Sequence, residues 1–177
     1  RNREHLLHVA KAAFTAGDTD IPLDEVARRA GVGIGTLYRH FPNRESLIEA
    51  VYQAELDHLA AAAPELAAQH PPVEALRAWM RLFVDYIAAK QVIAPALNGL
   101  VGGTTALYAH SGAVLHGAIN TLVAAAVASG EISSDIVPID RRRALAGVSN
   151  FAAGPGWEAS AKRLVDILIA GSRVPPP

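Results

Sequence analysis

The sequence contains no cysteine, and neither sign of charge is in excess. Without cysteine, a disulfide framework and a thiolate metal site are both excluded. The chain has 16 Lys and Arg against 17 Asp and Glu, which gives a formal net charge of −1. A chain this close to neutral has no overall attraction for nucleic acid, so any contact with DNA must come from the local placement of charge.

Strand-like segments are also missing, and aromatic residues make up only 6% of the chain. No stretch combines β-branched residues with period-two alternation, whereas alanine dominates a hydrophobic share of 51%. Since alanine favours close-packed helices, we expect an all-α protein of about nine helices. We expect Pro64 and Pro95 to interrupt helices, with a short helix at 96–101 after the second. We find no apolar run long and uncharged enough to span a bilayer, so we expect a cytoplasmic protein without membrane contact.

The segment from Pro22 to Phe41 carries most of the functional information. Its first half has apolar residues at helical spacing, and Gly31 can adopt the positive φ that ends a helix. In its second half Leu37 and Phe41 are four residues apart and face the first helix. Two short helices of this kind predict a helix-turn-helix that enters a major groove. The alternative is a structural turn, but such a turn has no need for outward Thr, Tyr, Arg and His together.

The run from Ala27 to Ile48 reads Ala-Arg-Arg-Ala-Gly-Val-Gly-Ile-Gly-Thr-Leu-Tyr-Arg-His-Phe-Pro-Asn-Arg-Glu-Ser-Leu-Ile and resembles the TetR family of bacterial transcriptional regulators. The resemblance implies a three-helix DNA-binding domain at 1–50 and a helical ligand-binding and dimerisation domain at 51–177. It also implies a homodimer on a palindromic operator in double-stranded DNA. Such a regulator is usually a repressor, and a small-molecule effector releases it.

The family's DNA-contact positions fall on the second helix of the motif and just after it. Gly35 would permit close approach, Thr36 could contact a base or a phosphate, and Arg39 could reach guanine or only the backbone. Tyr38 could instead pack partly in the core, and Arg39 could be a solvated surface charge. The full predicted set is Ile34, Gly35, Thr36, Tyr38, Arg39, His40 and Arg44.

Three departures from the family weaken the expected affinity for DNA. Gly33 stands where Ser or Thr usually begins the recognition helix, Ile21-Pro22 replaces a phosphate-binding Thr or Ser, and Asp24 replaces a residue that is often basic. Residues 1–52, which we call the head, also hold seven basic and seven acidic residues, so the head is neutral. These features favour the alternative of a small-molecule-binding helical protein whose DNA binding is weak or lost.

Aromatic and polar residues of the second domain are candidates for an effector pocket. An apolar cavity with a few polar groups is the usual small-molecule site, so we expect a largely apolar effector. An aromatic stripe at helical spacing is, however, more often core, and a lone His is more often solvated or bonded locally. The predicted pocket residues are Trp79, Phe83, Tyr86, Leu97, Leu100, Tyr108, His116 and Asn120.

The two helices expected at 139–152 and 158–170 each carry an apolar stripe near the end of the chain. One subunit can bury only part of this surface, so two copies would bury the rest as a four-helix bundle. The alternative is that Leu168 packs inside its own subunit. The predicted interface residues are Leu145, Val148, Ala152, Ala161, Leu164, Val165, Ile167 and Leu168.

A helical metalloenzyme is the third class that the sequence leaves open. Glu55 and His58 have the Glu-x-x-His spacing of di-iron bundles, but no other His has a Glu three residues before it. No Ser-His-Asp spacing or phosphate-binding glycine loop stands out either. We therefore expect no cofactor, no metal and no enzymatic activity.

Overall fold

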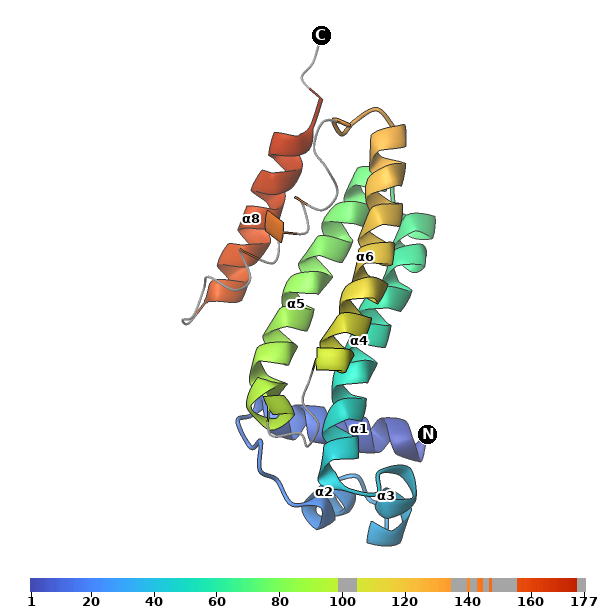
Figure 1. Ribbon diagram of the computed structural model, residues 1–177, viewed down its shortest axis with the longest axis vertical. Helices are drawn as coiled ribbons and strands as arrows, with labels where there is room; N and C mark the ends of the chain where they lie inside the picture. Colours follow the sequence, from blue (N-terminus) through green and yellow to red (C-terminus); the bar gives the residue numbers. More distant parts are fainter. Residues whose placement is uncertain (99–104, 135–139, 141–142, 145–146, 148–155, 175–177) are drawn as a thin grey trace. The chain divides into compact units, whose positions relative to one another are not determined.

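The computed structural model describes residues 1–98, 105–134, 140, 143–144, 147 and 156–174 (Figure 1). The chain is helical over most of these ranges, and the all-α class is confirmed. An isolated antiparallel bridge between Ile132 and Arg173 is the β-type pairing found in this described part. The helices are α1 (Asn2–Thr15), α2 (Leu23–Arg29), α3 (Ile34–His40), α4 (Arg44–Gln69), α5 (Pro72–Asn98), α6 (Thr105–Ala128) and α8 (Trp157–Ser172).

The chain divides into two compact units. The first unit comprises residues 1–57 and 89–108, and the second comprises 58–88 and 109–177. Helices α4, α5 and α6 therefore each contribute residues to both units. The predicted domain boundary after residue 50 stays a prediction.

In the first unit, α1, α2 and α3 contact one another beside the start of α4 (Figure 1). Their apolar faces are buried as the helical spacing predicts, because each short helix needs a neighbour to remove its stripe from water. Gly31 has a φ of 66°, which directs the chain from α2 into α3. The buried side chains include Leu6, Phe14, Val26, Leu37, Phe41, Leu47 and Ile48.

In the second unit, α5 is joined to α4 and to α8 by polar contacts around an apolar core. The Trp79 indole N–H donates to the Leu59 carbonyl at 2.9 Å. Lys162 on α8 lies 2.5 Å from the Asp85 carboxylate on α5, and Asp166 lies between two α5 arginines. The end of α8 returns to the segment after α6, where the Val174 N–H donates to the Glu131 carbonyl at 3.0 Å.

Two expected helix breaks were wrong. We expected Pro64 and Pro95 to interrupt the chain, but α4 runs through the first and α5 through the second. An interior proline costs about 3 kcal/mol through its missing N–H and its ring. Both prolines are exposed, while neighbouring positions such as Ala63 and Leu97 are buried. The burial of these neighbours holds the helices together, so tertiary packing outweighs the local preference.

The helix count also differs from the expected nine, since the described residues form seven. A short helix expected at 96–101 begins inside α5 instead. Most of the helix expected at 139–152 lies outside the described residues. Helix α8 agrees with the expected range of 158–170 to within two residues at each end.

The expectation that no apolar run could span a bilayer was wrong as a statement of length and composition. Residues 110–128 on α6 form one such run, with a mean hydropathy of 1.5. A core helix in a soluble protein meets the same criterion, so this run is weak evidence for a membrane span.

Candidate functional site

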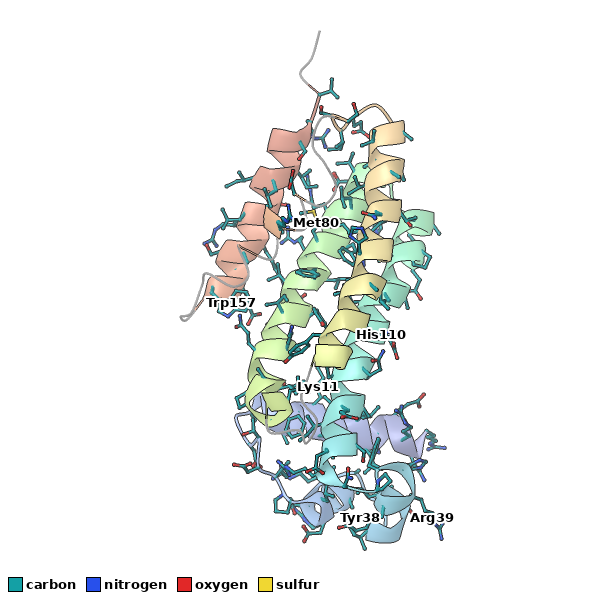
Figure 2. All side chains as sticks on the ribbon, viewed as in Figure 1. Lys11, Tyr38, Arg39, Met80, His110 and Trp157 are labelled. Atoms are coloured by element: carbon teal, nitrogen blue, oxygen red, sulfur yellow. The ribbon has the colours of Figure 1, made fainter. Side chains whose placement is uncertain are left out.

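Helix α3 presents nearly all of its side chains to solvent and is held by one of them. Leu37 is fully buried, whereas Ile34 is 42% exposed and Tyr38 is 50% exposed. Figure 2 shows Tyr38 and Arg39 on this short helix. Exposed large apolar and aromatic side chains on one face are typical of a binding surface, because water solvates them poorly. The predicted contact residues Ile34, Gly35, Tyr38, Arg39 and His40 are all exposed, and Thr36 is half-buried.

The start of α3 has no side chain that caps it. Gly33 is the N-cap, and its carbonyl accepts from the Thr36 N–H at 2.8 Å. A methyl group built on Gly33 or Gly35 would meet no atom within 4 Å apart from its chain neighbours and the adjoining helix backbone. The protein's own packing therefore does not require glycine at either position, and the first turn of α3 stays open to a partner.

Arg44 is engaged by the protein itself. Its guanidinium donates to the carbonyls of Thr19 and Ile21, in the loop before α2, and lies 3.8 Å from the Asp20 carboxylate. The predicted role of Arg44 as a phosphate contact stays a prediction. These bonds indicate a positioning role, because they attach the start of α4 to the entry of α2.

Helix α2 carries a charge cluster that the sequence analysis missed. Glu25 accepts two hydrogen bonds from Arg28, at 2.6 and 2.7 Å, and one from Arg29 at 2.7 Å. Arg29 also lies 3.7 Å from the Asp18 carboxylate. The spacing of three and four residues along one helix was the signal that could have revealed the cluster.

Glu25 is ionised throughout the neutral range. The hydrogen bonds from Arg28, and then those from Arg29, lower the pKa of the Glu25 carboxyl to about 2. A lowered pKa stabilises the fold above the ordinary value near 4.5, and this stabilisation is lost as the pH falls through about 2. At pH 7 the carboxylate therefore competes with any other anion for the two arginines.

We expect Glu25→Gln to strengthen binding to DNA of any sequence. The first helix of a helix-turn-helix crosses the DNA backbone, so Arg28 and Arg29 released from Glu25 become available to phosphates. The slope of log affinity against log salt concentration should become steeper by about 1 to 2, because each added phosphate contact contributes about 1. Fluorescence anisotropy with a labelled duplex at several salt concentrations measures this slope.

Glu65→Gln is the matched control, because Glu65 is an exposed acidic residue in the second unit. Both variants change the net charge by the same amount. An equal effect of the two substitutions would show that bulk charge, and not the release of the arginines, causes the change.

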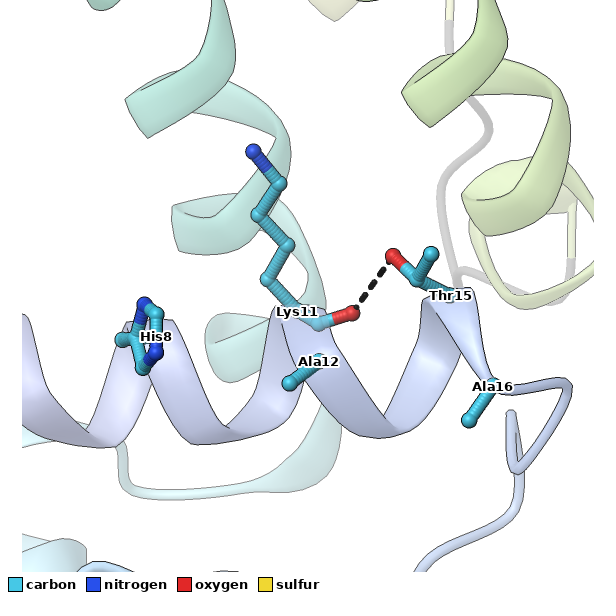
Figure 3. A pocket seen from close by; sticks show the side chains of 5 residues that line it. All are labelled: His8, Lys11, Ala12, Thr15 and Ala16. Atoms are coloured by element: carbon cyan, nitrogen blue, oxygen red, sulfur yellow. Dashed lines mark hydrogen bonds between the residues drawn. The ribbon is translucent and has the colours of Figure 1, made fainter.

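A surface hollow beside α1 shows no features of a ligand site. It is lined by His8, Lys11, Ala12 and Thr15 of α1 and by Ala16, the residue directly after this helix (Figure 3). The Thr15 hydroxyl donates to the Lys11 carbonyl at 2.9 Å, and the Lys11 ammonium lies 2.7 Å from the Glu55 carboxylate on α4. Two of the hollow's polar side chains, those of Lys11 and Thr15, are therefore already paired.

The Glu55 contact also bears on the metal hypothesis. The Glu55 carboxylate of the Glu-x-x-His pair is bonded to the Lys11 ammonium, which leaves it poorly placed to bind a metal cation. Among the residues that the structure describes, no group of three His, Asp or Glu side chains could hold a metal ion.

The predicted pocket residues fall into both units. Trp79, Phe83 and Tyr86 lie in the second unit, almost fully buried, with neighbouring ring centroids 5.9 Å apart. Leu97 and Tyr108 belong to the first unit, and Leu100 lies outside the described residues. The burial of the three aromatic residues agrees with the alternative that they form a core stripe, so their contact with an effector stays a prediction.

His116 and Asn120 differ from the other predicted pocket residues. They lie on α6 in the second unit, and each has one polar atom that is buried without a hydrogen-bond partner. Buried polar atoms are nearly always bonded, so each of these two atoms needs an explanation.

Helix α8 divides the predicted interface residues between two faces. Ala161 and Val165 are buried within the subunit, together with Ile169. Leu164 is 38% exposed and Ile167 is 63% exposed on the outward face, with Leu168 half-buried at its edge. The exposed side chains are the ones that a second copy can contact directly, and the predicted interface as a whole stays a prediction. Leu145, Val148 and Ala152 lie outside the described residues.

The fold and the exposed α3 define a helix-turn-helix protein with a helical second domain. Residues 71–174 match the family described as "Transcriptional regulator SbtR-like, C-terminal domain". Residues 6–51 match "Bacterial regulatory proteins, tetR family". The chain belongs to the TetR family of transcriptional regulators, and the resemblance seen in the sequence is confirmed.

Two solved structures are similar over nearly the whole chain. A TetR transcriptional regulator from Streptomyces coelicolor is 43% identical with a TM-score of 0.86, covering 98% of this chain and 99% of that one. A TetR regulatory protein from Mycobacterium vanbaalenii is 32% identical with a TM-score of 0.81, covering 98% and 96%. These likenesses support the fold of both units.

The similarity to a curated regulator covers a short part of the chain. An HTH-type transcriptional regulator of Staphylococcus aureus is 37% identical over 57 residues. The match spans 32% of this chain and 31% of the length of that protein. The relative is a regulator of the same HTH type, and the match carries no information about the effector.

Proposed function

We propose that this TetR-family regulator is a cytoplasmic repressor that binds a palindromic operator as a homodimer and is released by a small molecule. The observation that carries the proposal is the exposure of α3, whose one fully buried side chain is Leu37. A helix anchored at one point, with aromatic and basic side chains directed outward, fits the major groove of DNA. Residues 1–50 would bind DNA, and 51–177 would bind the effector and the second subunit.

A dimer is needed because one short helix contacts few base pairs. Two heads on a two-fold axis reach half-sites about 34–36 Å apart, one turn of DNA. The outward face of α8 supplies exposed apolar surface for such an association, with Leu164 and Ile167 at its centre. An effector that favours a different separation of the heads would lower the affinity for the operator without touching α3.

Variants of α3 test the DNA-binding face. We expect Tyr38→Ala to weaken binding about tenfold on specific and non-specific DNA alike, because a lost phosphate contact is insensitive to sequence. Arg39→Gln should lower the salt slope by about 1 if the guanidinium neutralises a phosphate. Mobility shifts with the DNA upstream of the protein's own gene, at several salt concentrations, measure both.

Two comparisons control this experiment. Tyr38→Phe retains the ring and removes only the hydroxyl, so it separates hydrogen bonding from packing. Circular dichroism of each variant shows whether the head is folded. Folded variants that bind as tightly as the wild type would refute the assignment of this face.

A protein that binds small molecules and has lost its affinity for DNA is the second candidate. The pairing of Arg28 and Arg29 with Glu25 favours it, because it withdraws two cations from the head. Absence of a mobility shift for the wild type on its own upstream DNA at low salt would support this candidate over the repressor.

A further inference from the structure

Residues 110–128 of α6 form an almost wholly apolar segment. They include no Asp, Glu, Lys or Arg, and their polar side chains after His110 are Ser111, His116, Asn120 and Thr121. The Thr121 hydroxyl donates to the Gly117 carbonyl of its own helix at 3.1 Å, so it is satisfied locally. Ser111 also has a bonded partner. His116 and Asn120 are therefore the two to explain.

Each of these two side chains has a buried polar atom without a partner. The atoms are Nδ1 of His116 and Oδ1 of Asn120. Among the described residues, two other atoms share this condition, Nε of Arg77 and Oδ1 of Asp166, but those two face each other at 3.7 Å as an ion pair. The pair on α6 has no such compensation.

The two side chains lie four residues apart, which places them one turn apart on the same side of the helix. A buried polar atom without a partner destabilises the fold, and an apolar side chain of similar size would avoid that loss. Their presence on an otherwise apolar segment is explained if a molecule outside the chain bonds them.

We propose that His116 and Asn120 form the polar end of the effector site, and that the effector is an uncharged, largely apolar molecule carrying a hydroxyl group. One hydroxyl can donate to the Asn120 oxygen and, at the same time, accept from a protonated Nδ1 of His116. A carboxylate would bring a negative charge against the buried Asn120 oxygen, which disfavours it. This inference rests on the proposed function, because it assumes that the second domain binds an effector.

The first test needs no ligand. Asn120→Leu and His116→Leu are each expected to leave the melting temperature of the unliganded protein unchanged or to raise it, because each removes an unbonded buried atom. Thr121→Val is the matched control on the same helix. A fall of more than about 4 °C in both leucine variants, but not in the control, would overturn the proposal, since it would show that internal bonds or a bridging water hold these side chains.

The second test uses straight-chain alcohols of four to ten carbons and the carboxylates of the same lengths. At ten times its dissociation constant, an alcohol that fits should raise the wild-type melting temperature by about 3–6 °C. The rise should be retained in Thr121→Val and lost in His116→Leu and Asn120→Leu. Carboxylates should have no such effect. No stabilisation by any alcohol, or equal stabilisation of all the proteins, would overturn the proposal.

DNA binding is measured in its own experiment, so that a failure of the proposed effector site can be distinguished from a failure of the proposed repressor function. All three α6 variants should bind the upstream DNA as the wild type does when no alcohol is present, since none of the three positions lies in the helix-turn-helix. If no alcohol stabilises the wild type while the wild type gives a normal mobility shift, this site alone is refuted. An alcohol response without any mobility shift in the wild type refutes the repressor and leaves the site in place.

Discussion

Replacing both Leu164 and Ile167 by glutamate is expected to convert the proposed dimer into monomers and to weaken operator binding more than about 100-fold, because two linked heads bind far more tightly than one. Both side chains are exposed in the single chain, so the substitution need not disturb the fold of one subunit. In a dimer, symmetry places four carboxylates in the apolar interface, where they lose their hydration without gaining partners.

The structure makes this a sharper experiment than a substitution at Leu168, which is half-buried and can act inside its own subunit. Ala159→Glu is the control, because Ala159 is exposed on α8 and lies away from Leu164 around the helix. Light scattering gives the mass in solution, and circular dichroism gives the helix content. A double variant that stays dimeric and binds DNA normally would show that the interface lies elsewhere.

Removing the Arg44 side chain is expected to destabilise the head and, through it, to weaken DNA binding. Arg44→Ala deletes the charge-assisted hydrogen bonds to the carbonyls of Thr19 and Ile21. Such bonds contribute about 1.5–3 kcal/mol each when buried. The side chain is 31% exposed, so we expect a total loss of about 2–3 kcal/mol. Hydrogen exchange of the α2 amides and urea unfolding measure it.

Arg44→Lys separates a positioning role from a phosphate contact. Lysine retains the charge but has no planar fork to donate to two carbonyls, so it should recover the salt slope and only part of the stability. If Arg44→Ala leaves the amide protection of α2 unchanged while the salt slope falls by about 1, the side chain contacts phosphate and does not hold the loop.

The sequence predicted the head well because the signals for it are local. The apolar spacing around Val26 and the glycine at position 31 act within a few residues, and so does the pair Leu37 and Phe41. The breaks expected at Pro64 and Pro95 failed because a proline's local penalty competes with burial of the residues around it. The Glu25 cluster was also local, and the spacing of its charges could have revealed it.

By itself, the amino-acid sequence determined the all-α class, the helix-turn-helix and its exposed second helix, since helical periodicity and glycine turns operate over short distances. Only the tertiary structure decided which apolar side chains of α8 are buried, since Val165 and Ile169 pack inside the subunit while Leu164 and Ile167 stay exposed. It also decided that Arg44 bonds the loop before α2, and that one buried atom of His116 and one of Asn120 have no hydrogen-bond partner. These outcomes depend on which distant residues meet, and short-range spacing carries no information about such contacts.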